Sequence, residues 1–195
     1  MSELQDSQLL RPSDEGDHVD RVRAQWRDAR PDLDTEPFAI VGRLGRATAY
    51  IDAAISAWLA DFDLTRASWD VLASLRRSGP PHRLSPTQLY RSAMRSSGAM
   101  THRLAALERD GLIGRVPDPA DGRGMLVELT PSGVALVNEV APVHLTNEAE
   151  LLAALSPDEQ RALAASLRTL LLALERRHAT PPPSGSGGRR RGPLP

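Results

Sequence analysis

Residues 96–124 read SSGAMTHRLAALERDGLIGRVPDPADGRG, and this stretch decides the fold. Apolar side chains at helical spacing predict a helix over residues 97–110, and a glycine follows its end. The polar residues 117–124, rich in proline and glycine, predict a turn between two short strands, one around residues 112–116 and one over residues 125–129. Because such a hairpin is marginal on its own, we expect it to pack against helices.

Three helices near this stretch share one start signal, a hydroxyl residue followed by proline. The hydroxyl caps free N–H groups and proline suits the first helical position, which predicts starts at Ser85-Pro86, Thr130-Pro131 and Ser156-Pro157. A glutamine or glutamate three residues after Ser85 and Ser156 completes a capping box. Another helix is predicted from Thr65 to Gly79-Pro80-Pro81. The resulting order of helices and strands predicts a winged helix-turn-helix domain.

Long amphipathic helices flank this domain on both sides. Apolar residues at intervals of three, four or seven predict helices over residues 17–29 and 38–62. A helix over residues 131–155 is expected to bend at Pro142, and a leucine-rich helix follows it. The domain between them is too small to cover these faces. We therefore expect these faces to be buried against a second copy of the chain, and the alternative is an intramolecular bundle.

The predicted fold is mainly α with a small β wing: a winged helix-turn-helix domain plus long N- and C-terminal dimerisation helices. The predicted parts are a flexible N-terminus (1–16), N-terminal helices (17–62) for dimerisation and, as a family resemblance implies, a ligand cap, the DNA-binding domain (63–130), C-terminal dimerisation helices (131–178) and a disordered basic tail (179–195). The tail holds Arg189 to Arg191, which either add nonspecific affinity for phosphate or have no role.

Composition excludes several classes of protein. The 195 residues include no cysteine and no lysine, and 24 arginines face 25 acidic residues for a net charge of −1. Disulfides, cysteine nucleophiles and cysteine-ligated zinc are therefore excluded. We expect no membrane span and no signal peptide, hence a cytoplasmic protein. The segment 62–130 is basic, with ten arginines against seven acids, which suits a nucleic-acid face.

The candidate DNA contacts lie on the two helices of the motif and on the wing. Small residues at the start of the second helix allow close approach to the major groove, and Arg123 at the wing suits a narrow minor groove. Arg123 could instead pair with Asp121 and stiffen the wing. The candidates are Ser85, Thr87, Arg95, Ser97, Gly98, Ala99, Thr101, His102 and Arg123.

The segment from Leu84 to Leu129 resembles the MarR family of winged-helix transcriptional regulators. The resemblance is carried by LSPTQL, by SSGAMTHRLAALERDGLIGRVPDPADGRG with its Asp121-x-Arg123 wing signature, and by VELTPSG. With the flanking helices it extends over about residues 17–178. It implies a homodimer that binds double-stranded DNA and regulates transcription.

A narrower resemblance links the chain to the urate-responsive branch of that family, which has an extra N-terminal helix. The signature residues match as Trp26, Asp70 beside Trp69, Arg103 and Arg115, which the resemblance implies as ligand-binding residues. It further implies that Asp70 pairs with Arg115 and that a bound small anion upsets this pair, with urate as the first candidate and a small carboxylate or a phenolic ligand as the alternative. The chain departs from relatives at two positions, with His102 in place of asparagine and Gly122 in place of arginine.

Other interpretations of these residues remain open at this point. Trp26 could be a packing residue, Arg103 a phosphate contact, and Asp70 with Arg115 a structural pair. The five histidines form no motif with acids, and no phosphate-binding glycine loop or zinc signature is present, so we expect no enzyme, no metal and no cofactor. The rival function is a ligand-independent architectural DNA-binding protein, or one controlled by a protein partner.

Overall fold

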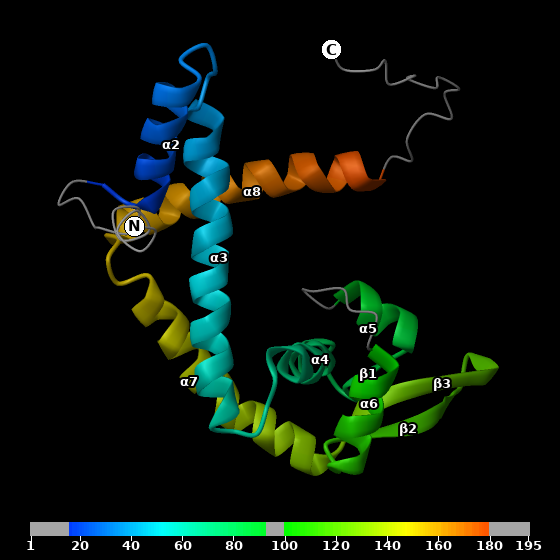
Figure 1. Cartoon of the computed structure of the whole chain (residues 1–195). Coiled ribbons are helices and arrows are strands. Elements are labelled where there is room, and N and C mark those ends of the chain that lie inside the picture. The colour runs from blue at the N-terminus through cyan, green and yellow to red at the C-terminus, as the bar shows by residue number, and fades with distance from the viewer. Residues whose placement is uncertain (1–15, 93–99, 180–195) are drawn as a thin grey trace, which may run out of the picture. The chain divides into compact units, whose positions relative to one another are not determined.

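The computed structural model describes residues 16–92 and 100–179 (Figure 1). In chain order its elements are α2 (His18–Ala29), α3 (Glu36–Ala60), α4 (Arg66–Arg77), β1 (Arg83–Leu84), α5 (Pro86–Ser92), α6 (Met100–Arg109), β2 (Ile113–Asp118), β3 (Asp121–Leu129), α7 (Pro131–Leu151) and α8 (Pro157–Ala179). The mainly helical fold with a small β wing is confirmed. The chain divides into two compact units, one ending at Glu148 and one beginning at Ala149.

The sheet has three antiparallel strands in the order β1-β3-β2. β2 and β3 form the hairpin that the sequence predicts, with Ile113 opposite Leu129. β1 was not expected, because a strand of two residues leaves no pattern in the sequence. It pairs with the end of β3, where Arg83 lies opposite Glu128 and forms an ion pair with it. The wing is thereby joined to the segment that precedes α5 (Figure 1).

The predicted helix starts are confirmed by their hydrogen bonds. The Ser85 hydroxyl accepts from the Gln88 N–H at 3.2 Å, and the Gln88 side chain accepts from the Ser85 N–H at 2.8 Å. Ser156 and Glu159 form the same reciprocal box. The Thr65 hydroxyl accepts from the N–H of Ser68 at 3.1 Å. These caps satisfy N–H groups that a helix start leaves free.

The buried core lies in the middle of the chain. It joins the end of α3 with α4, α5, α6, β2, β3 and the first half of α7, and its fully buried members include Leu59, Leu72, Leu75, Leu89, Leu107 and Val127. Thr130, which lies between β3 and α7, is hydrogen-bonded to the turn between α6 and β2. Its hydroxyl donates to the carbonyl of Gly111 at 2.7 Å, and its N–H donates to the carbonyl of Leu112 at 3.1 Å. The core therefore fixes α6 relative to the wing and to α7.

The long helices differ from the prediction in one detail. Pro142 lies inside α7, as expected, but the helix ends at Leu151. Leu152 and Leu155 were predicted on the same helix and lie in the turn before α8 instead. The Gln160 side chain donates to the carbonyls of both residues and so stabilises this turn. Apolar spacing alone did not reveal the turn, because leucines continue at helical intervals through it.

At the other end of the chain, α2 packs against the first half of α3. Asp17 caps α2, and both Asp17 and Asp20 bind the guanidinium of Arg43 on α3 at 2.8 and 2.7 Å. Arg23 pairs with Glu36 at the start of α3. These contacts hold the two helices antiparallel. α2 lies where the sequence predicts a short helix before α3.

Candidate DNA interface and ligand cavity

The first described turn of α6 carries two candidate DNA contacts. Thr101 and His102 are exposed, whereas Met100, Leu104 and Leu107 are buried in the core. The helix thus presents its polar residues outward while its apolar face fixes its position, as a recognition helix requires. Arg95, Ser97, Gly98 and Ala99 lie outside the described residues.

The remaining DNA candidates lie at the start of α5 and on the wing. The Ser85 hydroxyl accepts a hydrogen bond in the capping box, so a DNA contact by Ser85 can use only the hydrogen-bonding capacity that this bond leaves. Thr87 is exposed. Arg123 belongs to β3, next to the turn of the hairpin, and its side chain lies outside the described residues. The wing turn itself is held by a 2.9 Å bond from the Ala120 N–H to the Asp118 carboxylate.

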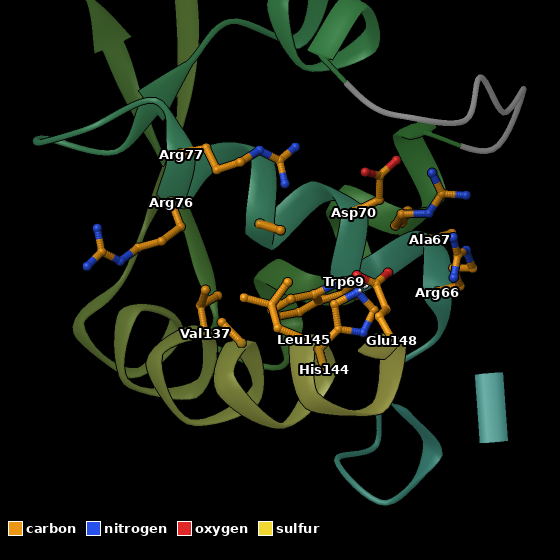
Figure 2. Close-up of a pocket in the computed structure, with 13 residues that line it drawn as sticks. Arg66, Ala67, Trp69, Asp70, Arg76, Arg77, Val137, His144, Leu145 and Glu148 are labelled. Atoms are coloured by element: carbon orange, nitrogen blue, oxygen red, sulfur yellow. Dashed lines mark ion pairs between the residues drawn. The ribbon is translucent and has the colours of Figure 1, made fainter. Parts of the chain in front are cut away.

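A cavity of about 430 Å³ opens among α4, α6 and α7 (Figure 2). Its apolar wall comes from Trp69 and Ala73 on α4 and from Val137, Ala141 and Leu145 on α7. An apolar wall with a few polar groups, in a cavity of this volume, is typical of small-molecule sites. All of these residues belong to the unit that ends at Glu148.

The polar groups of the cavity are mostly arginines. Asp70 and Arg103, both predicted as ligand residues, lie together on its lining. The lining also contains three arginines that the sequence interpretation missed, Arg66, Arg76 and Arg77. Arg66, Asp70, Ala73 and Arg77 follow one another at intervals of four, three and four. That helical spacing places them on one face of α4, and it was the available signal.

Two of the missed arginines are engaged with neighbouring helices. Arg76 Nε donates to the side-chain oxygen of Asn138 on α7 at 3.1 Å, which ties α4 to α7. Arg77 donates to the buried hydroxyl of Ser74 at 3.1 Å, and that hydroxyl donates to the carbonyl of Ser92 at the end of α5. The cavity wall is thus connected to the helix before the recognition helix.

His144 on α7 also lines the cavity, and neighbouring side chains hold its imidazole in place. Trp58 Nε1 donates to His144 Nδ1 at 3.3 Å, and the ring of Trp69 lies edge-on to the imidazole with centroids 5.2 Å apart. Nε2 lies 3.3 Å from the carboxylate of Glu148. Burial lowers the pKa of His144, the Glu148 carboxylate raises it in part, and the Arg66 guanidinium lowers it again. The net effect is a lowered pKa for His144, which favours the neutral imidazole.

Arg115 lies elsewhere. Arg115 Nε donates to the carboxylate of Glu108 at 3.0 Å, so the expected pair with Asp70 is replaced by a pair between β2 and α6. Both side chains are exposed, and the pair joins the strand to the helix that precedes it. Arg115 is absent from the described lining of the cavity. Its ligand role stays a prediction.

Trp26 is also remote from the cavity within one chain. It is 47% exposed and lies on α2 one turn after Arg23, which pairs with Glu36. The cavity residue Arg66 pairs with Asp52, further along α3, at 3.5 Å. About 16 residues of α3 separate Glu36 from Asp52, which corresponds to about 24 Å of helix. The predicted contact of Trp26 with a ligand is untested and would need a second copy of the chain.

Three helices with a wing packed against them, and a recognition helix whose polar side faces outward, define a winged helix-turn-helix DNA-binding regulator. A sequence model of the MarR family matches residues 64–125. The chain is 38% identical to the HTH-type transcriptional regulator PecS of Dickeya dadantii over 149 residues, which are 76% of this chain and 90% of PecS. The chain belongs to the MarR family of transcriptional regulators, whose members are not enzymes.

Two solved structures are similar to this chain. A mutant MarR of E. coli in complex with operator DNA has a TM-score of 0.63 and 29% identity, covering 72% of this chain and 99% of that one. BpsR of Bordetella bronchiseptica, whose DNA binding is regulated by 6-hydroxynicotinic acid, has a TM-score of 0.61 and 29% identity, covering 67% of this chain and 91% of that one. The first shows the fold on DNA, and the second shows it in a ligand-regulated protein.

Two other properties concern the described residues only. Within residues 16–92 and 100–179, no three His, Asp or Glu side chains come together as a set of metal ligands. None of the helices in the same ranges combines the length and the hydrophobicity that crossing a membrane requires.

Proposed function

We propose that this chain is a transcriptional repressor that binds a pseudo-palindromic operator as a homodimer and is released from it by a small anion, with urate as the first candidate. The observation that carries the proposal is the position of Arg103. It lies on α6, the recognition helix, and also lines the cavity. A ligand that draws this guanidinium toward itself therefore acts directly on the helix that reads DNA.

The chemistry of the cavity favours a planar anion. An aromatic ring can stack on the apolar wall formed by Trp69 and Leu145, while guanidinium groups bind its charged edge. If the ligand prefers the protein off DNA, DNA and ligand lower each other's affinity by the same factor. Carboxylic acids and phenols fit the same groups, and they are the second candidates. As a DNA-binding regulator, the protein acts in the cytoplasm.

The dimer is supported by apolar side chains that one chain leaves exposed. On α2 and α3 these include Trp26, Ile40, Val41 and Tyr50, and on α8 they include Leu163, Leu170, Leu171, Leu172 and Leu174. Exposed apolar side chains that are grouped on helices are typical of contact surfaces between proteins. In a two-fold dimer the two recognition helices would contact successive half-sites of the operator.

A gel shift on the DNA upstream of the gene tests the proposal, with and without urate and a panel of aromatic carboxylates. We expect one of these anions to release the complex from wild-type protein. Arg103→Gln should lose most of this response, whereas Arg109→Gln, an exposed arginine on the same helix, should keep it. If no anion changes DNA binding or the melting temperature, the ligand proposal fails and membership of the family stands.

The wing contact gives a second test. Arg123→Ala is expected to weaken operator binding at least about tenfold, because a guanidinium in a narrow minor groove contributes charge and shape readout. The dissociation constant should be measured at fixed salt, since phosphate contacts make it salt-dependent. An unchanged constant would remove the wing contact. Footprinting separates the rival function: a discrete palindromic footprint supports a regulator, and diffuse protection supports an architectural protein.

A further inference from the structure

The arginines of the cavity differ in how well their donors are satisfied. Arg76 and Arg77 donate to Asn138 and Ser74, respectively. Arg66 pairs through Nε with Asp52 at 3.5 Å, but its Nη1 is buried and has no hydrogen-bond partner. A buried donor without a partner is costly, and buried guanidinium groups are normally satisfied. Among the described arginines that line the cavity, Arg66 is therefore the one with a buried guanidinium nitrogen that lacks a hydrogen-bond partner.

A second donor lies on the facing helix. Because Trp58 donates to Nδ1 of His144, the neutral imidazole carries its proton on Nε2. The side chain of His144 is only 12% exposed, and the ring of Trp69 lies against it, so its orientation is fixed. The cavity thus presents a fixed N–H on α7 near the guanidinium of Arg66 on α4. Figure 2 shows both side chains toward the same end of the pocket, away from Arg76.

This N–H already has a carboxylate beside it. Glu148 Oε1 lies 3.3 Å from His144 Nε2, one helical turn further along α7. The Glu148 side chain is 42% exposed, so it can turn into solvent at little cost. The position beside Nε2 therefore suits an anionic oxygen. In this structure the carboxylate of Glu148 occupies that position.

We propose that Arg66 and His144 bind the charged edge of the effector anion, that Trp58 positions the imidazole for this contact, and that Glu148 is the carboxylate which the effector displaces. The inference rests on the proposed function, since it concerns the ligand of the same cavity. The ring of the effector then lies on Trp69, and its opposite edge extends toward Arg103. One small molecule would in this way connect α4, α6 and α7.

The test is calorimetric titration of the full-length protein with two probes, benzoate and urate. We expect Arg66→Gln and His144→Phe each to lower the affinity for the probe at least about tenfold, because each variant removes a hydrogen bond to a charged group. Trp58→Phe keeps the ring but removes its N–H, so we expect a smaller loss. Arg109→Gln, outside the cavity, is the control.

The Glu148→Gln variant is expected to bind more tightly, which is a result that a folding defect would not produce. Removing the competing charge should tighten binding of the same probe by a few-fold, while the melting temperature of the free protein stays the same. Wild-type affinity in both Arg66→Gln and His144→Phe, or weaker binding in Glu148→Gln, would overturn the inference but leave the proposed function in place. If wild type binds neither probe nor any other anion of the gel-shift panel, the proposed function fails and the inference fails with it.

Discussion

The segment from Ile55 to Val140 and the helices outside it differ in how completely one chain buries them. Every buried apolar residue of the described chain except Val19 lies within that segment. The DNA-binding part therefore has its own core, with α4 buried along one whole face. This core contacts α6 and the wing within one chain.

The terminal helices present the opposite case. Over residues 157–177, where burial is described, α8 has no buried residue, and α2 buries Val19 alone. Leu163, Leu170 and Leu174 follow at intervals of seven and four, which places them along one exposed face of α8. The comparison teaches that the two regions have different requirements: one region has a core of its own, and we expect the other to be completed by a second copy.

The largest effect is expected from breaking the second region. In the double variant Leu170→Glu with Leu174→Glu, charges replace the apolar face, so the dimer should dissociate. DNA affinity should fall at least about 100-fold, because the second half-site no longer benefits from high effective concentration. Light scattering and a gel shift at fixed salt measure the two effects. Arg168→Gln on the same helix is the control, and an intact double-mutant dimer would contradict this account of α8.

A smaller effect is expected inside the first region, at Gly133 in the first turn of α7. A Cβ at this position would lie 2.1 Å from the carbonyl oxygen of Leu112, so backbone must move. Gly133→Ala should lower the free energy of unfolding by about 1–3 kcal/mol, measured by urea denaturation.

Gly45→Ala on α3 is the matched comparison for Gly133→Ala. A Cβ at Gly45 meets nothing within 4 Å in one chain. Alanine favours a helix over glycine, so we expect stabilisation by about 1 kcal/mol or less. Destabilisation by Gly45→Ala would show that the second copy approaches α3 closely at this point, which would sharpen the contrast between the regions.

The smallest effect is expected at the pair that replaces the predicted Asp70–Arg115 contact. Arg115 and Glu108 are 37% and 41% exposed, and exposed pairs contribute little. Glu108→Gln should change the free energy of unfolding by less than about 1 kcal/mol in thermal or urea denaturation. Arg115→Gln should behave in the same way. A larger loss in both variants would show that this pair, and not only the core, holds α6 against the wing.

Much of the fold could be predicted because its signals are local. The capping boxes at Ser85 and Ser156 depend on residues three apart, and the wing hairpin depends on a short polar turn between apolar strands. β1 was missed because two residues carry no period, and it exists only because β3 lies beside it. The end of α7 at Leu151 was missed because apolar spacing continues past it.

The site was predicted in part. Asp70 and Arg103 do line one cavity, although 33 positions along the chain separate them. The sequence interpretation missed Arg66, His144 and Glu148 as cavity residues. No pattern within α4 or α7 singles them out, and they come together only because the two helices pack side by side. The partner of Arg115 was predicted wrongly, because the sequence does not tell which carboxylate a strand residue will meet.

By itself the sequence determined the helices, the wing, the family and the exposed apolar faces, since caps, periodicity and turn residues act over a few positions. Only the tertiary structure decided which guanidinium groups share a cavity, which of them keeps an unfilled donor, and which nitrogen of His144 faces Glu148. The physical reason is range. Helix and turn preferences are set by neighbours in the chain, whereas hydrogen-bond partners and cavities are set by the packing of helices far apart in sequence.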